Sequence, residues 1–447
     1  MGVNDVLDLQ QPLTDGGIRS VNFFNGRLLS GRDLSREQTA RREADARLGR
    51  AVGEGVAYGL EVARDGKLDK PAAPVLRINA GLAVNRVGQT LRLAADVSVA
   101  LTRRFDAADA GCVFANCTPL AGGTYVAGAG VYLLTIAPAQ TSEGRAATNG
   151  LDPTNVACNT DATVEAVQFR LITINRLRYS GLDVSSPQFR NRLAYRCFGI
   201  EAREQNAIDP WRVDAPRYGL IDELREVGLD DRDVPLAVLS WTLDGIQFID
   251  MWAVRRALLA PDALSGFSFQ RDPLKPEELS SFAFIARRRR LIEAHAMCAQ
   301  FQEQLADTLA AASNPAAVVA TDLLRYLPPF GIVPLQQAPL RGFFEPTFFS
   351  GIVRRPPPGS AQSTPFIDVR LLGALQGQAL TGSPTDLTSH EFIWLYRPWQ
   401  NVKARVEGQS VQPMVVFASG LLPNLAVARF DMARFDYSDY AHCCGDA

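Results

Sequence analysis

The chain has 447 residues, of which 47% are hydrophobic and 21% charged, and its formal net charge is −2. This composition is typical of a globular protein with two to four domains, and it lacks the basic excess of nucleic-acid-binding proteins. No apolar run reaches the roughly 20 residues that span a bilayer, and residues 1–8 do not have the pattern of a signal peptide. We therefore expect cytoplasmic synthesis, no membrane span and no nucleic-acid partner.

The first predicted element is a helix over residues 31–52, preceded by a polar, turn-rich arm. Ser30 can cap this helix, and Asp33 completes a variant of the capping box. The helix has few apolar positions, so it is expected to bury a narrow stripe and to leave a charged surface. Phe23 and Phe24 cannot both be buried against so sparse a helix. At least one of them is expected to reach a neighbouring domain or subunit.

Residues 63–260 are expected to form a β-rich domain with inserted loops. Short alternating segments between residues 75 and 101 predict a tight antiparallel meander, with Gly81 and residues 86–89 in its turns. A buried strand at 131–136 is followed by a predicted loop over 138–162. The pattern further predicts a helix over about 187–204 and a hairpin over 234–249.

A long helix is predicted over residues 276–313, where Pro276 suits the first turn and Asn314-Pro315 the end. A shorter helix is expected over 316–326. Strands predicted at 366–372, 392–396 and 414–418 indicate a final β domain. The predicted fold class is thus α+β and multi-domain, with a β-rich N-terminal domain, a long central helix and a C-terminal β domain. Its parts are the arm and helix (1–62), the β-rich domain (63–260), the helical segment (261–330) and the C-terminal β domain (331–447).

No residue pattern demands an enzyme. The chain has only three histidines, and it contains neither a nucleophile elbow nor a phosphate-binding loop. His390 lacks the second histidine of a zincin helix. His295 and Cys298 share a face of the long helix and are expected to be core residues rather than zinc ligands. A glycosidase that uses two carboxylates is the enzyme hardest to exclude, because a sequence does not show which Asp and Glu side chains meet.

Metal or cofactor binding is not expected. Cys112 and Cys117 could form a metal site with residues 442–444, which read His-Cys-Cys, if the tail folded back. A disulfide between Cys112 and Cys117, or free thiols, is simpler. The carboxylates of residues 230–233 lack the spacing of a calcium loop and are expected to form a turn before the next strand.

Two groups of residues are predicted to form interfaces. The run Arg287–Arg290 points all round its helix, and it could cover apolar surface with its stems, contact an acidic neighbouring subunit or, least expected, bind nucleic acid. Aromatic residues in Pro/Gly-rich surroundings are expected to anchor loops to their own domain or to a partner, although a sugar-binding surface would use them too. The predicted interface residues are Phe23, Phe24, Arg287, Arg288, Arg289, Arg290, Phe343, Phe344, Phe348 and Phe349.

Two segments carry a resemblance to a known family. They are Phe23-Phe-Asn-Gly-Arg-Leu-Leu-Ser-Gly-Arg-Asp-Leu34 and Gly55-Val-Ala-Tyr-Gly-Leu-Glu-Val62. Together they resemble an uncharacterised bacterial family that is associated with phage-tail-like, contractile injection particles. The hairpin pattern around residues 80–91 and the segment 234–250 are similar to segments of such tail proteins.

This resemblance implies a structural subunit in the baseplate, collar or cap region of a particle. The subunit would act by protein–protein assembly, as a homo-oligomer and with other particle subunits. The particle would act at the cell envelope or after release. The rival expectation is a carbohydrate- or receptor-binding module of such a particle, and a carboxylate-based glycosidase comes third.

Overall fold

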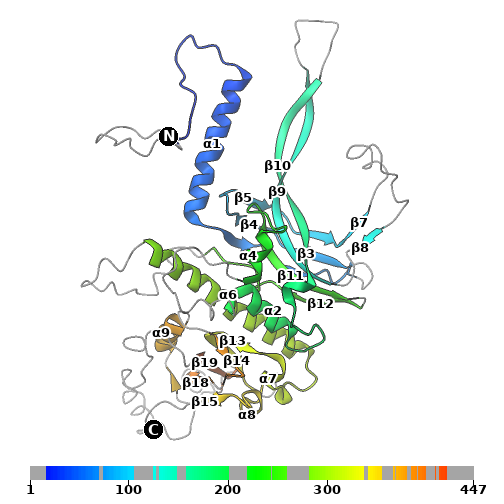
Figure 1. The fold of residues 1–447 in the computed structure, drawn as a ribbon, viewed down its shortest axis with the longest axis vertical. Coiled ribbons are helices and arrows are strands. Elements are labelled where there is room, and N and C mark those ends of the chain that lie inside the picture. Colours follow the sequence, from blue (N-terminus) through cyan, green and yellow to red (C-terminus); the bar gives the residue numbers. More distant parts are fainter. Residues whose placement is uncertain are drawn as a thin grey trace, which may run out of the picture.

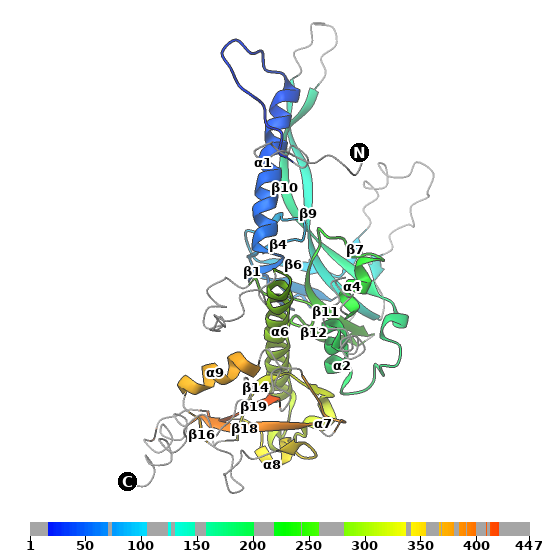
Figure 2. The same cartoon turned by 60° about the vertical axis from the view of Figure 1, so that its left-hand side comes forward.

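The computed structural model describes residues 17–69, 74–104, 124–126, 130–147, 158–200, 219–242, 244–258, 281–336, 341–354, 366–367, 369–379, 384–389, 391–398, 408 and 412–419. It is an α+β protein with several separate sheets, as the sequence predicts. Figures 1 and 2 show an N-terminal helix and a long hairpin that extend in the same direction from a central body. A second sheet lies at the other end. No helix among the described residues is long and apolar enough to cross a membrane.

Helix α1 spans Gly31–Val52, the range that the sequence predicts. The Ser30 side chain accepts a hydrogen bond from the Asp33 amide, and the Asp33 carboxylate accepts one from the Ser30 amide. This capping box satisfies donors that the first helical turn leaves unpaired. The helix ends at Gly53, whose φ of 108° disfavours any residue with a side chain.

The predicted meander is present, but each of its three strands is broken in the middle. Its segments pair antiparallel in two sheets, β1-β4-β5 and β2-β3-β6. The break in the first strand falls at Gly59 and Leu60, which have φ values of 64° and 58°. Gly81 begins β4 beyond the corresponding break, so it is not the hairpin turn that the sequence predicts. The segments are β1 Gly55–Gly59, β2 Val62–Arg64, β3 Val75–Ile78, β4 Gly81–Val84, β5 Thr90–Leu93 and β6 Val97–Ala100.

The central sheet has the strand order β10-β9-β11-β12, and short strands β7 (Thr102–Arg104) and β8 (Thr124–Val126) pair separately. Its strands are β9 Gly130–Ala147, β10 Cys158–Ile174, β11 Val234–Thr242 and β12 Gly245–Asp250. The hairpin at 234–249 is confirmed, whereas the predicted loop over 138–162 is wrong for most of its length. Strands β9 and β10 continue through it as a paired ladder. Their outer halves are exposed and rich in Ala and Thr, so no alternating apolar pattern marks them.

The inner part of the central sheet is buried on both faces. Val131 and Leu133 of β9 face a core built with helices α2 (Phe189–Phe198) and α4 (Gly219–Arg225). The alternate residues Tyr132 and Leu134 face the meander. Helix α2 ends at Phe198, because Gly199 adopts a left-handed conformation and donates to the Arg196 and Tyr195 carbonyls. Residues 201–204 of the predicted helix lie outside the described residues.

Helix α6, Ser281–Ala311, joins the central body to the C-terminal sheet (Figures 1 and 2). Its Met297 belongs to the core around α2, while Phe301 and Leu305 belong to the next core. The predicted helix over 316–326 is wrong as a single element. The chain instead forms a 3-10 turn, Pro315–Ala317, helix α7, Ala320–Leu323, and strand β13, Tyr326–Leu327.

The C-terminal part is a mixed sheet of five strands covered by short helices. The predicted strands at 392–396 and 414–418 are present, but the one at 366–372 is wrong beyond Ile367, since helix α9 starts at Val369. The division into the four predicted sequence ranges stays a prediction. The elements are β14 Phe330–Pro334, α8 Glu345–Phe348, β15 Val353–Arg354, β16 Phe366–Ile367, α9 Val369–Ala379, β17 Thr385–Asp386, β18 Phe392–Pro398 and β19 Met414–Ser419.

Candidate assembly surface

Polar contacts join the aromatic loop before α1 to the first turn of the helix. The Arg27 amide donates to the Phe24 carbonyl, and Gly26 in this turn has a φ of 89°. The Arg27 guanidinium donates to the Asn22 carbonyl at 2.8 Å and to the Asp33 carboxylate at 2.7 Å. Hydrogen bonds from Ser30, and then from Arg27, lower the pKa of Asp33 to about 2. The loop is therefore tied to the first turn of α1.

This ordered loop presents apolar side chains to solvent. The exposed fractions are 53% for Phe23, 62% for Phe24, 92% for Leu28 and 53% for Leu29. A fixed loop that exposes two aromatic rings beside two leucines has the composition of a contact surface.

Helix α1 continues this exposed surface, and the aromatic loop and the helix together, residues 21–52, form the α1 arm. All 22 of its residues are described, and Ala40 alone among them is buried. Leu34, Leu48 and Val52 are 51%, 67% and 49% exposed. In folded proteins, most of the stability of a helix comes from packing one of its faces against the rest of the structure. Little of α1 packs on its own chain.

The base of α1 is fixed to the body by contact between two backbones. A Cβ atom on Gly49 would lie 2.1 Å from the Gly88 carbonyl oxygen, and one on Gly88 would lie 1.9 Å from that of Ala46. Only glycine permits this approach. The Arg50 guanidinium also donates to the Val87 carbonyl at 3.2 Å. The β4–β5 turn thus sets the direction in which the helix projects.

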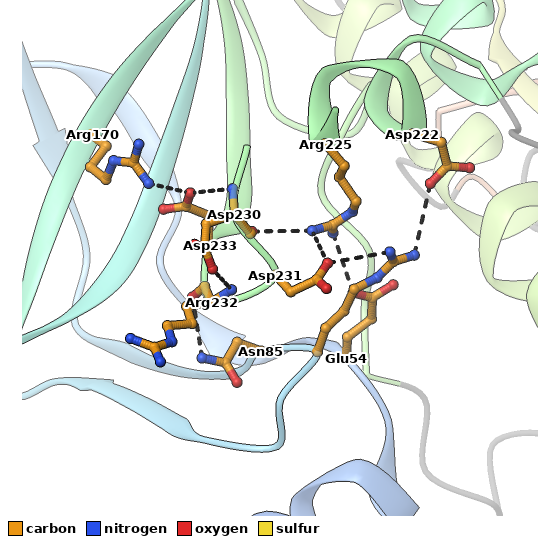
Figure 3. A network of polar contacts seen from close by, with 10 residues as sticks. Glu54, Asn85, Arg170, Asp222, Arg225, Asp230, Asp231, Arg232 and Asp233 are labelled. Carbon is orange, nitrogen blue, oxygen red and sulfur yellow. Dashed lines mark hydrogen bonds and ion pairs between the residues drawn. The ribbon is translucent and has the colours of Figure 1, made fainter. Parts of the chain in front are cut away.

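A network of ion pairs lies next to this contact, at the base of α1 (Figure 3). Arg86 contacts Glu54 at 2.8 Å, Asp231 at 3.6 Å and Asp222 at 3.8 Å. Arg225 contacts the same Glu54 at 3.4 Å and Asp231 at 3.3 Å. Four segments that are distant in sequence meet here: the α1–β1 connection, the β4–β5 turn, α4 and the turn before β11.

The turn at residues 230–233 has the structural role that its sequence predicts. Asp233 accepts hydrogen bonds from the Asp230 amide at 2.9 Å and from Arg170 at 2.5 Å, and its side chain is fully buried (Figure 3). The Asn85 side chain donates to the Arg232 carbonyl at 3.2 Å. These contacts engage the carboxylates with protein donors. Among the described residues, no group of three His, Cys, Asp or Glu side chains is arranged to hold a metal ion.

A second cluster of carboxylates surrounds Arg190 where α2, β12 and α6 meet. Arg190 contacts Asp250 at 3.0 Å, Asp307 at 2.5 Å and Glu303 at 3.9 Å. Burial, with the negative charge of Asp250 as the next cause, raises the pKa of Glu303 to about 7. Perturbed carboxylates also occur in active sites. Here, however, Asp250 is buried and already accepts hydrogen bonds from Arg190, Gln300 and the Ala253 amide.

An open pocket of about 790 Å³ lies beside the central sheet, between β9, β11 and the segment after β10. Its lining contains Arg176 and Arg178 but no Asp or Glu among the described residues. Its aromatic rings, Tyr132, Tyr179 and Trp241, are almost fully buried. This pocket therefore offers neither paired carboxylates nor an exposed ring on which a sugar could stack.

The C-terminal aromatic residues divide between the core and the surface. Phe343, Phe348 and Phe349 are fully buried, and the Phe343 and Phe348 ring centroids are 4.6 Å apart. These three side chains anchor their loop to its own core, so the interface prediction needs correction for them. Phe344 is 50% exposed and remains a predicted interface residue, as do Phe23 and Phe24.

His295 and Cys298 are the remaining candidate residues whose side chains the structure describes. The His295 ring lies edge-on to Trp252, with centroids 5.6 Å apart, and burial lowers its pKa. The Cys298 thiol donates to the Phe330 carbonyl at 2.9 Å. Arg287–Arg290 lie within α6, but their side chains are outside the described part of the structure. His390, Cys112, Cys117 and residues 442–444 are outside the described residues.

Comparisons with known proteins identify no family for this chain. No protein family model matches the chain, and no curated protein matches it. One similar solved structure is titled "Crystal structure of TssK"; the match has a TM-score of 0.24 and 9% sequence identity. It covers 66% of this chain and 60% of that chain. A likeness at this level carries no argument about fold or function.

Proposed function

We propose that this chain is a structural subunit of a phage-tail-like, contractile injection particle, in its baseplate, collar or cap region. It acts by binding other copies of itself and other subunits, without catalysis. It is made in the cytoplasm and assembled into a particle that acts at the cell envelope or after release.

The observation that carries this proposal is the exposure of the α1 arm. A capped helix of 22 residues has one buried residue, and its ordered leading loop exposes Phe23 and Phe24. Burying a Phe side chain is worth about 1.5–3 kcal/mol. Assembly would bury both rings, whereas an isolated monomer leaves this gain unused. The motif around Phe23–Leu34 that resembles the tail-associated family is the same segment.

Replacing both aromatic residues tests the proposal. The F23A/F24A variant is expected to melt at the temperature of the unaltered chain, because both rings are already exposed. It is expected to lose incorporation into particles purified from the native host. Tyr58→Ala, which removes another exposed ring (60% exposed) on β1, serves as a matched control and should be incorporated normally.

Two results would contradict the proposal. One is a double variant that enters particles as well as the unaltered chain does. The other is a host that contains no particle-associated copy of the chain, measured by mass spectrometry of purified particles.

A further inference from the structure

Helix α1 carries an exposed seam along its whole length. Residues 34, 38, 41, 45, 48 and 52 follow one another in steps of four and three, which is the spacing of a helix–helix contact. At about 100° per residue they fall within roughly 80° of arc. All six are exposed. The seam, in chain order, consists of Leu34, Gln38, Arg41, Asp45, Leu48 and Val52.

The chain's own contacts lie to either side of this seam. On one side, Val21 donates its amide to Glu37 at 3.0 Å, and Ala40 is buried. On the other, Arg42 contacts Glu165 of β10 at 3.5 Å, and Gly49 meets the β4–β5 turn. The loop, the hairpin and the body therefore hold α1 in place without covering the seam.

The seam is complementary to the same seam on a second copy of the helix that runs in the opposite direction. When the helix is placed against a second copy running in the opposite direction, Leu34 meets Val52, Gln38 meets Leu48, and Arg41 meets Asp45. Each contact occurs twice about a two-fold axis, as in an isologous dimer. In the described part of the chain, neither Arg41 nor Asp45 makes an ion pair. A parallel pairing would instead place Arg41 on Arg41 and Asp45 on Asp45.

We infer that two copies of this chain associate through the α1 seam as an antiparallel helix pair. The apolar ends, Leu34 with Val52, exclude water, and the central Arg41–Asp45 pairs set the register. Ala44 and Ala51, both exposed, line one edge of the seam and permit a close approach of the two helices.

The pairing also gives the aromatic loop a place to dock. The helix is about 33 Å long, since each residue adds about 1.5 Å. In an antiparallel pair, the tip of one arm reaches the base of the other. Phe23 and Phe24 then lie near the partner's Leu48 end. The inference deepens the self-association part of the proposed function, and its failure would leave the binding of the chain to other particle subunits standing.

Sedimentation analysis of the full-length chain over a wide range of concentrations tests the pairing. The unaltered chain should show a reversible equilibrium between 48.7 kDa monomers and dimers. Arg41→Glu alone and Asp45→Arg alone each create two like-charge contacts, and each should raise the dimer dissociation constant by about tenfold or more. The double variant R41E/D45R restores complementary charges and should return the constant to near its original value.

Arg36→Glu is the matched control, because position 36 lies on the opposite side of α1 and a reversal there should leave the dimer unchanged. At concentrations where all variants are monomeric, their melting curves should differ little, since these side chains are exposed and an i,i+4 charge pair within a helix contributes little to stability. A monomer at every concentration, or a double variant as weak as the single ones, would overturn the inference.

Photo-crosslinking gives a second measurement that leaves the charges unaltered. A benzoylphenylalanine at position 34, in a mixture of ordinary and ¹⁵N-labelled chains, should link to residues near Leu48 and Val52 of the other copy. Links to position 34 of the other copy indicate a parallel pairing and would refute the antiparallel one.

Discussion

Asp233 is a buried carboxylate that links several segments near the base of α1. Its oxygens accept from Arg170, from the Asp230 amide and from the Thr135 hydroxyl at 3.2 Å, while its side chain is fully buried. It thereby joins β9, β10 and the turn before β11. The neighbouring Asp231 takes part in the ion-pair network but is 58% exposed.

Asp233→Ala is expected to lower the free energy of unfolding by about 3 kcal/mol, because it leaves buried donors without an acceptor. Asp231→Ala is expected to cost less than about 1 kcal/mol, since an exposed ion pair is screened by water. Urea denaturation of both variants measures the difference. Equal losses would show that burial does not distinguish the two carboxylates.

Glu303 is expected to make stability depend on pH. The pKa of Glu303 is about 7 in the folded state, above its ordinary value of 4.5, so the folded chain binds more protons than the unfolded chain between these two pH values. Its contribution is therefore favourable below about pH 4.5 and is lost as the pH rises through about 7. Glu303→Gln should remove this slope and stabilise the protein at pH 8 by up to about 3 kcal/mol. Thermal melting of both proteins between pH 5 and pH 8 measures this pH dependence. Melting temperatures that change equally with pH in the two proteins would contradict the role of Glu303.

Helix α1 depends on the fit between its base and the β4–β5 turn. This contact forms between backbones, and Gly88 also has a φ of 86°, which a side chain disfavours. The direction of the arm, and with it the position of the seam, follows from two glycines that are far apart in the sequence.

Gly88→Ala is expected to destabilise the protein by about 2 kcal/mol or more, through steric overlap and an unfavourable φ. Hydrogen exchange in the last turns of α1 should accelerate. Gly31→Ala is the control, because a Cβ there would meet nothing within 4 Å. It should leave exchange unchanged, and a protected α1 base in Gly88→Ala would contradict the proposed anchoring.

The molecule as a whole is held together by α6. Met297 packs in the core with α2, and four residues later Phe301 packs against Phe417 of the C-terminal sheet, with ring centroids 5.2 Å apart. The Arg190 cluster lies along the same helix, so apolar and ionic contacts both link the two parts.

Phe301→Ala is expected to cost about 3–5 kcal/mol, as a large cavity forms in a packed core. Because α6 contributes to both cores, hydrogen exchange should accelerate in β9 as well as in β19. Phe344→Ala, at a ring that is 50% exposed, should have little effect. Faster exchange confined to β19 would show that the two parts unfold independently.

Local sequence patterns are sufficient to predict several helices and strands of this protein. The capping residues and charged face of α1 predict its bounds correctly, because a capped helix is defined by contacts within a few residues. The hairpin of β11 and β12 follows from a Gly-containing turn between alternating apolar residues. The sequence also predicts that Phe23 and Phe24 are not both buried against the helix next to them, since it offers too few apolar positions.

The features that local patterns do not predict depend on contacts between residues distant in the sequence. The outer half of the β9–β10 hairpin is strand because each residue pairs across the ladder, although its Ala/Thr-rich sequence suits a loop. Phe343, Phe348 and Phe349 became core residues because β19 and α6 supply neighbours that no local pattern reveals. The arginine network and the Gly49–Gly88 contact bring together residues tens of positions apart. Which side chains meet, and which stay exposed for a partner, depends on packing between distant segments rather than on the periodicity of any one of them.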